Sequence, residues 1–329
     1  MKICITGATG FIGSRMALYF IEQGHEVVIL ALINNEHEKA NSAMLASKGV
    51  KVVIGDVSQI EKVKESLNGV DWVFHLAAAQ HEAGVPDEYF RRINVDGTKA
   101  MLEASLEMGV KRFIYGSTIG VYGYAMDGEL DEESRLEPAN IYGVTKLEAE
   151  RLVLSYQDKM PVTAIRISET YGPGDRRLLK LFKGIRKNRF FIIGDGENIH
   201  QLIYVDDLIR GMEKAASSEE AIGEVFVLAG AEKLSTTDMC RAVGSAVNKN
   251  RSLPKFPMWP FTILAIIMEK VFPLIGKEPP LHRRRLDFFA KSFYFKNNKA
   301  ISKLDFSPQT SFERGAELTA QWYQSEELV

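Results

Sequence analysis

Cysteine is scarce in this chain of 329 residues, which contains only Cys4 and Cys240. Two cysteines are too few for a disulfide framework or a structural zinc site, so no metal is expected. A reducing, cytoplasmic compartment is the expectation that follows. Residues 2–7 form a short apolar run that ends in glycine without a cleavage-site pattern, so no signal peptide is expected either.

The chain also lacks an excess of one charge and any long hydrophobic run. Lys and Arg number 41 against 43 Asp and Glu, and a net charge of −2 provides no electrostatic drive toward nucleic acid. The longest apolar run, residues 258–268, has 11 residues and is interrupted by Pro260 and Thr262. Because about 20 apolar residues are needed to cross a bilayer, a membrane-spanning protein is not expected.

Short apolar segments rich in Val and Ile alternate with helical segments in the first half of the chain. Such runs suit strands that are buried on both faces. The expected strands are residues 3–5, 27–32, 50–54, 70–76, 113–115 and 162–167. The expected helices are residues 11–23, 89–108 and 142–157. This alternation predicts an α/β fold of the Rossmann type, a doubly wound parallel sheet with helices on both faces.

The pattern changes after about residue 168, and a chain of this length suits about two domains. Gly172, Pro173 and Gly174 form a loop signal. The elements expected after it are a basic helix at 176–187, strands at 203–205 and 225–228, and helices that begin near Ser235 and Ser311. We predict a dinucleotide-binding domain at residues 1–168, to which 199–229 return. Residues 169–198 and 230–329 would form a smaller C-terminal substrate-binding lobe.

A glycine-rich turn, residues 6–13, directly follows the first predicted strand and opens the first predicted helix. Gly7 permits the tight turn, Gly10 lets the backbone approach a pyrophosphate, and Gly13 lets the helix pack closely on the strand. The pyrophosphate would lie at the helix N-terminus, where free N–H groups and the helix dipole favour anions. In this context we favour a dinucleotide cofactor over a glycine-rich turn without a ligand.

The end of the second predicted strand lacks the acid that usually binds the ribose hydroxyls of NAD, and no arginine follows for the 2′-phosphate of NADP. Asn34 and Asn35 stand there instead, and they either bind the ribose or form the turn. Arg15 and Lys39 are candidate phosphate partners, although solvent-facing positions suit both better. The sequence therefore leaves the choice between NAD and NADP open.

Tyr142 and Lys146 are four residues apart in a predicted helix and share one of its faces. A nearby cation lowers the pKa of a phenol, which is about 10 in water, and makes it a better proton-transfer group near neutral pH. Ser117 and Thr118 end the fifth predicted strand, where a hydroxyl can hold a substrate oxygen. Together with the dinucleotide turn, this pattern predicts an active site.

These segments together resemble the extended short-chain dehydrogenase/reductase family, in its NAD(P)-dependent epimerase/dehydratase branch. The matching segments cover most of residues 1–210 in family order: 6–13, 55–57, 75–78, 94–98, 116–118, 121–123, 142–146, 171–175 and 203–207. The resemblance implies a catalytic set of Thr118, Tyr142 and Lys146.

The same resemblance implies a set of cofactor-binding residues. The set is Gly7, Thr9, Gly10, Phe11, Ile12, Gly13, Asp56, Val57, Ala77, Ala78, Asn94, Tyr142 and Lys146. Asp56 and Val57 would contact adenine, Ala77 and Ala78 would line the path of the ribose and nicotinamide, and Asn94 would buttress the active-site loops.

The chain departs from the nucleotide-sugar enzymes of this family at several positions. Ile119 and Gly120 stand where the 4,6-dehydratases carry an Asp–Glu pair, so dehydration is not expected. Glu169 stands three residues after Arg166, where the epimerases usually carry Asn, and a carboxylate there would repel a diphosphate. His200 stands where these enzymes usually carry Arg. Both changes weaken the case for a nucleotide sugar.

Residues 278–289 and the apolar segment before them resemble the 3β-hydroxysteroid dehydrogenase-like subgroup. The apolar segment is expected to be a helix buried within the lobe, because a surface helix normally keeps a polar side. The alternative is a lid or a peripheral membrane contact through residues 258–275, with Lys270 and residues 283–285 available for anionic headgroups.

The function expected first is hydride transfer between a nicotinamide and a secondary alcohol or ketone, with a lipophilic or uncharged small molecule as substrate. Tyr142 would transfer the proton, Lys146 would lower its pKa and hold the nicotinamide ribose, and Thr118 would position the substrate oxygen. A nucleotide-sugar epimerase is the alternative. A non-catalytic dinucleotide sensor is a third hypothesis, which the presence of Tyr142 and Lys146 argues against. The resemblance also implies a homodimer through the helices at 96–108 and 146–157.

Overall fold

The computed structural model describes residues 1–80, 85–272 and 283–329, the side chains of residues 283–285 excepted. Residues 273–275 of the predicted membrane contact and residues 278–282 of the segment that resembles the hydroxysteroid dehydrogenases lie outside the described residues. The side chains of the basic run at 283–285 lie outside them too. No helix in the described part of the chain is long and apolar enough to span a bilayer.

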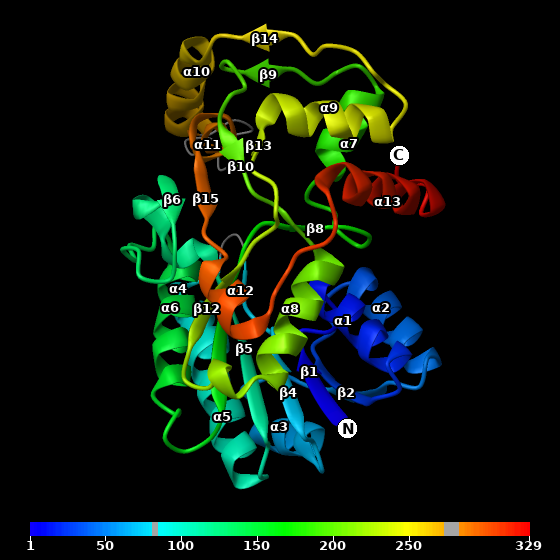
Figure 1. Ribbon diagram of the computed structural model, residues 1–329, viewed down its shortest axis with the longest axis vertical. Coiled ribbons are helices and arrows are strands. Elements are labelled where there is room, and N and C mark those ends of the chain that lie inside the picture. The colour runs from blue at the N-terminus through cyan, green and yellow to red at the C-terminus, as the bar shows by residue number, and fades with distance from the viewer. Residues whose placement is uncertain (81–84, 273–282) are drawn as a thin grey trace.

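A parallel sheet of seven strands, in the order β12-β7-β5-β4-β1-β2-β3, forms the centre of the molecule (Figure 1). The strands are β1 (Lys2–Thr6), β2 (Glu26–Ala31), β3 (Lys51–Ile54), β4 (Trp72–His75), β5 (Arg112–Thr118), β7 (Val162–Ile167) and β12 (Val225–Leu228). From β1 the chain builds the sheet outward in one direction through β2 and in the other through β4. The predicted doubly wound sheet is therefore confirmed, and its switch point, where such folds bind ligands, lies between β1 and β4.

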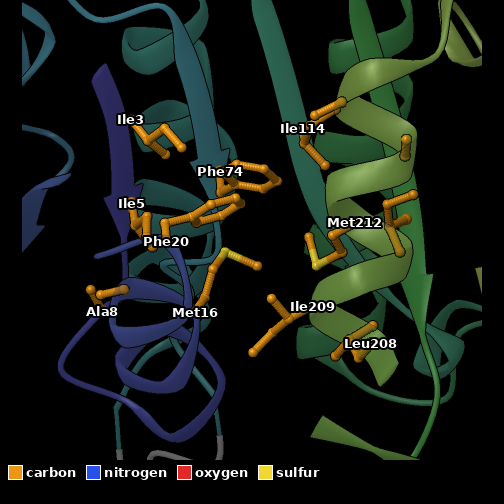
Figure 2. Packing of buried hydrophobic residues seen from close by; sticks show 14 of the residues in the cluster. Ile3, Ile5, Ala8, Met16, Phe20, Phe74, Ile114, Leu208, Ile209 and Met212 are labelled. Carbon is orange, nitrogen blue, oxygen red and sulfur yellow. The ribbon is translucent and has the colours of Figure 1, made fainter. Parts of the chain in front are cut away.

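Helices cover both faces of the sheet, and each face has its own hydrophobic core. In β1, Ile5 belongs to one core and Cys4 to the other, as the alternation of side chains along a strand requires. The first core contains residues of α1 (Phe11–Glu22), α2 (Glu36–Ser47) and α8 (Val205–Ser217). The second contains residues of α3 (Ile60–Leu67), α5 (Gly97–Glu107) and α6 (Ile141–Leu154). Figure 2 shows the first core, where Met16 and Phe20 of α1 lie near Phe74 of β4.

The helix predicted at residues 89–108 is divided into three parts. They are α4 (Asp87–Arg91), a π-helical turn at Arg92–Asp96, and α5. Gly97 begins α5 against the second core, because a Cβ at this position would lie 2.5 Å from Cγ2 of Val57. The π turn carries Asn94, and such turns are frequent at functional sites.

A smaller lobe lies beyond the carboxyl ends of the strands, at the top of Figure 1. Its helices are α7 (Leu179–Arg186), α9 (Thr236–Ala246), α10 (Met258–Val271), α11 (Arg283–Ala290) and α13 (Phe312–Ser325). Two helix starts agree with the sequence, since the hydroxyls of Ser235 and Ser311 accept hydrogen bonds from the backbone N–H of Asp238 and Arg314 at 3.0 and 3.2 Å. Phe182 of α7 packs in the centre of this lobe.

Short two-stranded ladders lie outside the main sheet. The pairs are β8 (Thr170–Tyr171) with β11 (Ile203–Tyr204), β9 (Ile192–Ile193) with β14 (Lys255–Phe256), β10 (Ile199–His200) with β13 (Leu234–Ser235), and β6 (Gly128–Leu130) with β15 (Phe293–Phe295). The strand predicted at 203–205 is therefore shorter and lies outside the main sheet, because Val205 already begins α8. The predicted domain boundaries stay a prediction, and the structure adds that α12 (Asn298–Leu304) returns to the first core through Leu304.

The prediction that the apolar segment at 258–268 is buried is wrong. The segment is part of α10, where only Ala265 is buried, while Trp259 is 67% and Ile267 is 52% exposed. Apolar composition on every helical face favours burial, but α10 packs on its neighbours through one side only. Its outward side is an exposed apolar surface.

Candidate active site

The glycine turn brings the backbone of α1 to the switch point of the sheet. Gly7 has a φ of +70°, and a Cβ there would lie 2.8 Å from the backbone nitrogen of Ala77. A Cβ on Gly13 would lie 2.5 Å from the carbonyl oxygen of Gly7. Gly10 differs, since a Cβ there meets only that same oxygen, at 3.3 Å. The fold therefore requires Gly7 and Gly13, whereas Gly10 faces open space at the N-terminus of α1.

A buried hydrogen-bond network, which sequence reasoning missed, holds β4 against this turn. The hydroxyl of Thr6 accepts hydrogen bonds from the backbone N–H of Leu76 and Ala77 at 3.1 and 3.0 Å. Hydrogen bonds also join the ring of His75 to the hydroxyls of Thr6 and Thr98, at 2.7 and 2.9 Å. Burial, aided by the charge of Lys146, lowers the pKa of His75 to about 3, so the ring is neutral. The network positions Ala77, one of the predicted cofactor contacts.

After β2, Asn35 caps the N-terminus of α2. Its side-chain oxygen accepts a hydrogen bond from the backbone N–H of Glu38 at 3.0 Å. The carboxylate of Glu38 in turn accepts one from the backbone N–H of Asn34 at 2.6 Å. Arg15, which lines the cavity, is paired with Asp206 at 2.7 Å. Glu38 thus places an acid beside the end of β2, where the strand itself has none.

Helix α6 positions the predicted catalytic pair. Asn140 caps the helix by accepting a hydrogen bond from the backbone N–H of Gly143 at 2.9 Å. Tyr142 and Lys146 then face β5, where Thr118 hydrogen-bonds with Tyr142. Burial raises the pKa of Tyr142, and the Thr118 hydrogen bond and the charge of Arg177 oppose that rise. Arg177, which the sequence did not single out, is therefore a cation whose charge opposes the rise in the pKa of this phenol.

Lys146 is buried with its ammonium 4.1 Å from the centre of the Tyr115 ring. Burial lowers the pKa of Lys146 to about 7, while the negative charge of Glu150 opposes the change. Glu150 lies one helical turn further along α6. Lys146 is therefore only partly charged near neutral pH, and a ligand that accepts its hydrogen bonds would favour the charged form.

Glu150 is held by two residues from neighbouring strands. Its carboxylate accepts a hydrogen bond from the Ser117 hydroxyl at 2.6 Å and bonds from the Arg166 guanidinium at 2.8 and 3.2 Å. The side chains of Arg166 and Glu150 are only 4% and 2% exposed. Arg166 therefore braces the helix behind the site and does not reach a ligand. The spacing of Glu150, four residues after Lys146, is the signal in the sequence that could have pointed to it.

Asn94 connects the loop after β4 to the helix of the catalytic pair. Its side chain accepts a hydrogen bond from the backbone N–H of Ala79 at 2.7 Å and donates to the hydroxyl of Thr145 at 2.9 Å. It lies between the two predicted ligand-binding segments. Asp56, which was predicted to contact adenine, accepts a hydrogen bond from the backbone N–H of Ser58 at 2.8 Å.

One cavity of about 1240 Å³ brings these parts together. The cofactor candidates and catalytic candidates that line it are Gly7, Thr9, Gly10, Phe11, Ile12, Gly13, Asp56, Val57, Ala77, Ala78, Thr118, Tyr142 and Lys146. Asn94 is buried behind the residues that line the cavity. An open helix N-terminus at Gly10, the acid Glu38 beside the end of β2 and a buried lysine in a cavity of this size fit a dinucleotide.

The other end of the cavity has an apolar wall and a polar edge. Its apolar residues are Ile119, Met126, Phe288, Phe293 and Trp322. At the edge, His200 lies 4.0 Å from the carboxylate of Glu169. Burial lowers the pKa of His200 to about 4 and raises the pKa of Glu169. A pocket with an apolar wall and several charged residues, Arg177 and Lys291 among them, thus adjoins the catalytic pair.

Comparisons with known proteins agree with this arrangement. A 2-alkyl-3-oxoalkanoate reductase of Stenotrophomonas maltophilia is 28% identical over 331 residues, which are 96% of this chain and 97% of the reductase. A decarboxylating sterol-4-alpha-carboxylate 3-dehydrogenase of Mus musculus is 27% identical over 336 residues, which are 97% of this chain and 90% of that protein. Among solved structures, the UDP-glucuronic acid 4-epimerase of Bacillus cereus in complex with NAD matches with a TM-score of 0.78 and 25% identity, covering 99% of both chains.

The family model that matches this chain is that of the NAD dependent epimerase/dehydratase family, over residues 3–229. The matched region spans the seven-stranded sheet, the glycine turn and the helix with Tyr142 and Lys146. This chain therefore belongs to the NAD dependent epimerase/dehydratase family.

Proposed function

We propose that this protein is an NAD-dependent oxidoreductase that interconverts a secondary alcohol and a ketone on a lipophilic small molecule. The observation that carries the proposal is the single cavity in which Thr118, Tyr142 and Lys146 adjoin the glycine turn at one end and an apolar wall at the other. The bound nicotinamide would supply the hydride acceptor or donor.

In the oxidation direction, Tyr142 takes the proton of the substrate hydroxyl as the carbinol carbon loses its hydride. Thr118, which hydrogen-bonds with Tyr142, holds the substrate oxygen at the end of β5. Lys146 lies one turn along α6, where it holds the nicotinamide ribose and stabilises the phenolate through its charge. The ion pair between Glu150 of α6 and Arg166 of β7 fixes α6 to the sheet.

A nucleotide-sugar epimerase is the second candidate, favoured by the likeness to the UDP-glucuronic acid 4-epimerase. The apolar wall favours the oxidoreductase. So do the names of two relatives, a reductase and a dehydrogenase. The residues at 119 and 120 carry no acid or base for a dehydration.

Net reduction of the cofactor separates the two candidates. We expect NADH to accumulate in proportion to a long-chain secondary alcohol added to the protein with excess NAD. UDP-glucose and UDP-glucuronic acid should be neither bound nor converted. Epimerisation of a UDP-sugar with no accumulation of NADH would overturn the proposal.

Glu38 is proposed to select NAD over NADP. Its carboxylate, held by the backbone of Asn34, lines the part of the cavity after β2 and would repel a 2′-phosphate. We expect Glu38→Gln to tighten NADP binding by about tenfold, with a much smaller effect on NAD. Glu36→Gln, at an exposed acid in the same first turn of α2, is the matched control. Equal dissociation constants for NADP in the wild type and Glu38→Gln would contradict this role.

We also propose a homodimer formed through α5 and α6. Leu106 of α5 is 42% exposed. Leu152 and Leu154 of α6, the helix that packs on α5, are half-buried. Met101, Leu102 and Leu147 of the same two helices are buried and take no part in this contact. Two such helices from each of two copies would make a four-helix contact under twofold symmetry. Light scattering at micromolar concentration should give twice the chain mass, and Leu106→Lys should give a monomer.

The exposed face of α10 is proposed to contact an anionic membrane surface. Trp259, Ile263, Ile267 and Val271 recur along this face with Lys270 among them, whereas the more polar Thr262 and Glu269 are less exposed. An apolar stripe with an aromatic end and a lysine suits the headgroup region of anionic lipid. Helix α11, which packs on α10, also carries Phe288 of the cavity wall. A lipophilic substrate would therefore reach the cavity directly from the bilayer.

Sedimentation with vesicles tests this contact. The protein should sediment with phosphatidylglycerol-containing vesicles, and the double variant Ile263→Ser/Ile267→Ser should stay in solution. Ile301→Ser, at an apolar position of α12 that is also 53% exposed, is the control. Unchanged sedimentation of the double variant would contradict the proposal. So would self-association that is lost only in the double variant, since a second copy would then cover α10.

A further inference from the structure

Arg177 lies on the loop between β8 and α7, which closes over the start of α1. Gly174 of this loop has a φ of +100°, and a Cβ there would lie 3.0 Å from the ring of Phe11. The loop thus places Arg177 in the cavity wall, and its charge is close enough to lower the pKa of Tyr142. The side chain is nevertheless 59% exposed, so it faces the open part of the cavity.

The guanidinium of Arg177 is fixed by its own loop. Its Nε donates to Oδ1 of Asp175 at 3.2 Å, and its Nη2 donates to the carbonyl oxygen of Thr170. The same carboxylate oxygen accepts from the backbone N–H of Arg177 at 2.8 Å. Nη1 has no hydrogen-bond partner within the described part of the chain. A guanidinium held in this way loses little freedom on binding an anion and keeps two N–H groups for it.

We propose that Arg177 binds a carboxylate of the substrate, and that the substrate is a 3-hydroxy or 3-oxo acid with an alkyl chain. This inference rests on the proposed oxidoreductase function and names its substrate class. The carboxylate would lie on Nη1 of Arg177, the carbinol oxygen between Thr118 and Tyr142, and the chain against the apolar wall. The reaction oxidises the carbinol carbon to a ketone. Its hydride goes to NAD, its hydroxyl proton leaves through Tyr142, and the carboxylate is unchanged.

The compounds after which two relatives are named carry the same pair of groups. A 2-alkyl-3-oxoalkanoate has a carboxylate next to the carbon that bears its alkyl branch, and the ketone is one carbon further on. A sterol-4-alpha-carboxylate that is oxidised at carbon 3 has the same relation between acid and alcohol. The substrate would then be lipophilic in its chain but charged at one end, which departs from the uncharged substrate that the sequence alone favoured.

Other charged groups around Arg177 leave this assignment intact. Asp175 is buried and already engaged with Arg177. Burial raises the pKa of Glu169, so its repulsion of an acid is weakened. Lys291 at the cavity edge is paired with Asp287 at 3.5 Å. A diphosphate could use the same guanidinium, so the experiment must separate a carboxylate from a diphosphate.

The test compares an acid with its uncharged derivative. A long-chain 3-hydroxy acid and its methyl ester are assayed for NADH formation with the wild type, Arg177→Gln and Arg177→Lys. We expect Arg177→Gln to raise the KM for the acid by about 10- to 100-fold with little change in the KM for the ester, and Arg177→Lys to fall between. Loss of the charge near Tyr142 would change kcat for acid and ester alike, so KM is the quantity compared. Arg186→Gln, which removes the same charge from α7 outside the cavity, is the control. Stabilisation of NAD-loaded protein by the acid in thermal unfolding gives a second readout, and Arg177→Gln should lose it.

Each failure has its own signature. If the wild type turns over acid and ester alike and Arg177→Gln changes neither KM, the carboxylate site is wrong and the oxidoreductase stands. If a UDP-sugar is epimerised and its binding depends on Arg177, the guanidinium binds a diphosphate and both proposals fall. An equal rise in the KM for acid and ester in Arg177→Gln, with Arg177→Lys no better, would reduce Arg177 to a structural residue.

Discussion

Tyr142→Phe is expected to lower kcat by about 10²- to 10⁴-fold while NAD still binds within about threefold of the wild-type affinity. The ring fills the same volume between Thr118 and the helix, so only the group that transfers the proton is lost. The measurement is NADH formation under saturating NAD, together with a titration of NAD binding followed by calorimetry.

The control for this experiment is Tyr124→Phe, because Tyr124 is 69% exposed and lies outside the catalytic set. It should keep full activity. A rate close to that of the wild type in Tyr142→Phe would show that another group transfers the proton and would remove the main support for the proposed mechanism. A loss of NAD affinity as large as the loss in kcat would instead assign the hydroxyl to cofactor binding.

Gly10→Val is expected to weaken NAD binding by at least about 100-fold, which corresponds to ~2.7 kcal/mol. The valine side chain would occupy the space at the N-terminus of α1 where the pyrophosphate approaches the backbone. The fold should survive, because the only close neighbour of the new Cβ is the carbonyl oxygen of Gly7, at 3.3 Å. Thermal unfolding with and without NAD measures both effects, since a ligand that binds only the native state raises its stability.

Gly13→Ala provides the contrast for Gly10→Val. Its Cβ would lie 2.5 Å from the carbonyl oxygen of Gly7, so α1 would have to move away from β1. We expect this variant to lose stability even without NAD, whereas Gly10→Val should lose mainly the stabilisation by NAD. Unchanged NAD affinity in Gly10→Val would show that this turn does not hold the cofactor.

Much of the sheet and both ends of the candidate site could be predicted from local sequence alone. Runs of Val and Ile of strand length, such as residues 27–32, alternate with helical segments, and this alternation permits few arrangements other than a doubly wound parallel sheet. Spacing was equally informative for function. Glycines three residues apart after a strand, and Tyr142 four residues before Lys146, place chemical groups on one surface through helix geometry alone.

Tertiary structure decided which polar residues reach the cavity and which only brace it. Arg166 is buried against Glu150 and does not line the cavity. Arg177, 35 residues beyond Tyr142 in the chain, lines it, and its charge opposes the rise in the pKa of Tyr142. The exposure of α10 was likewise not predictable. Apolar residues on every face predict that a helix is covered, but they do not identify the surface that covers it. Local periodicity determines the elements, whereas contacts between distant segments determine which side chains are buried, paired or open to a ligand.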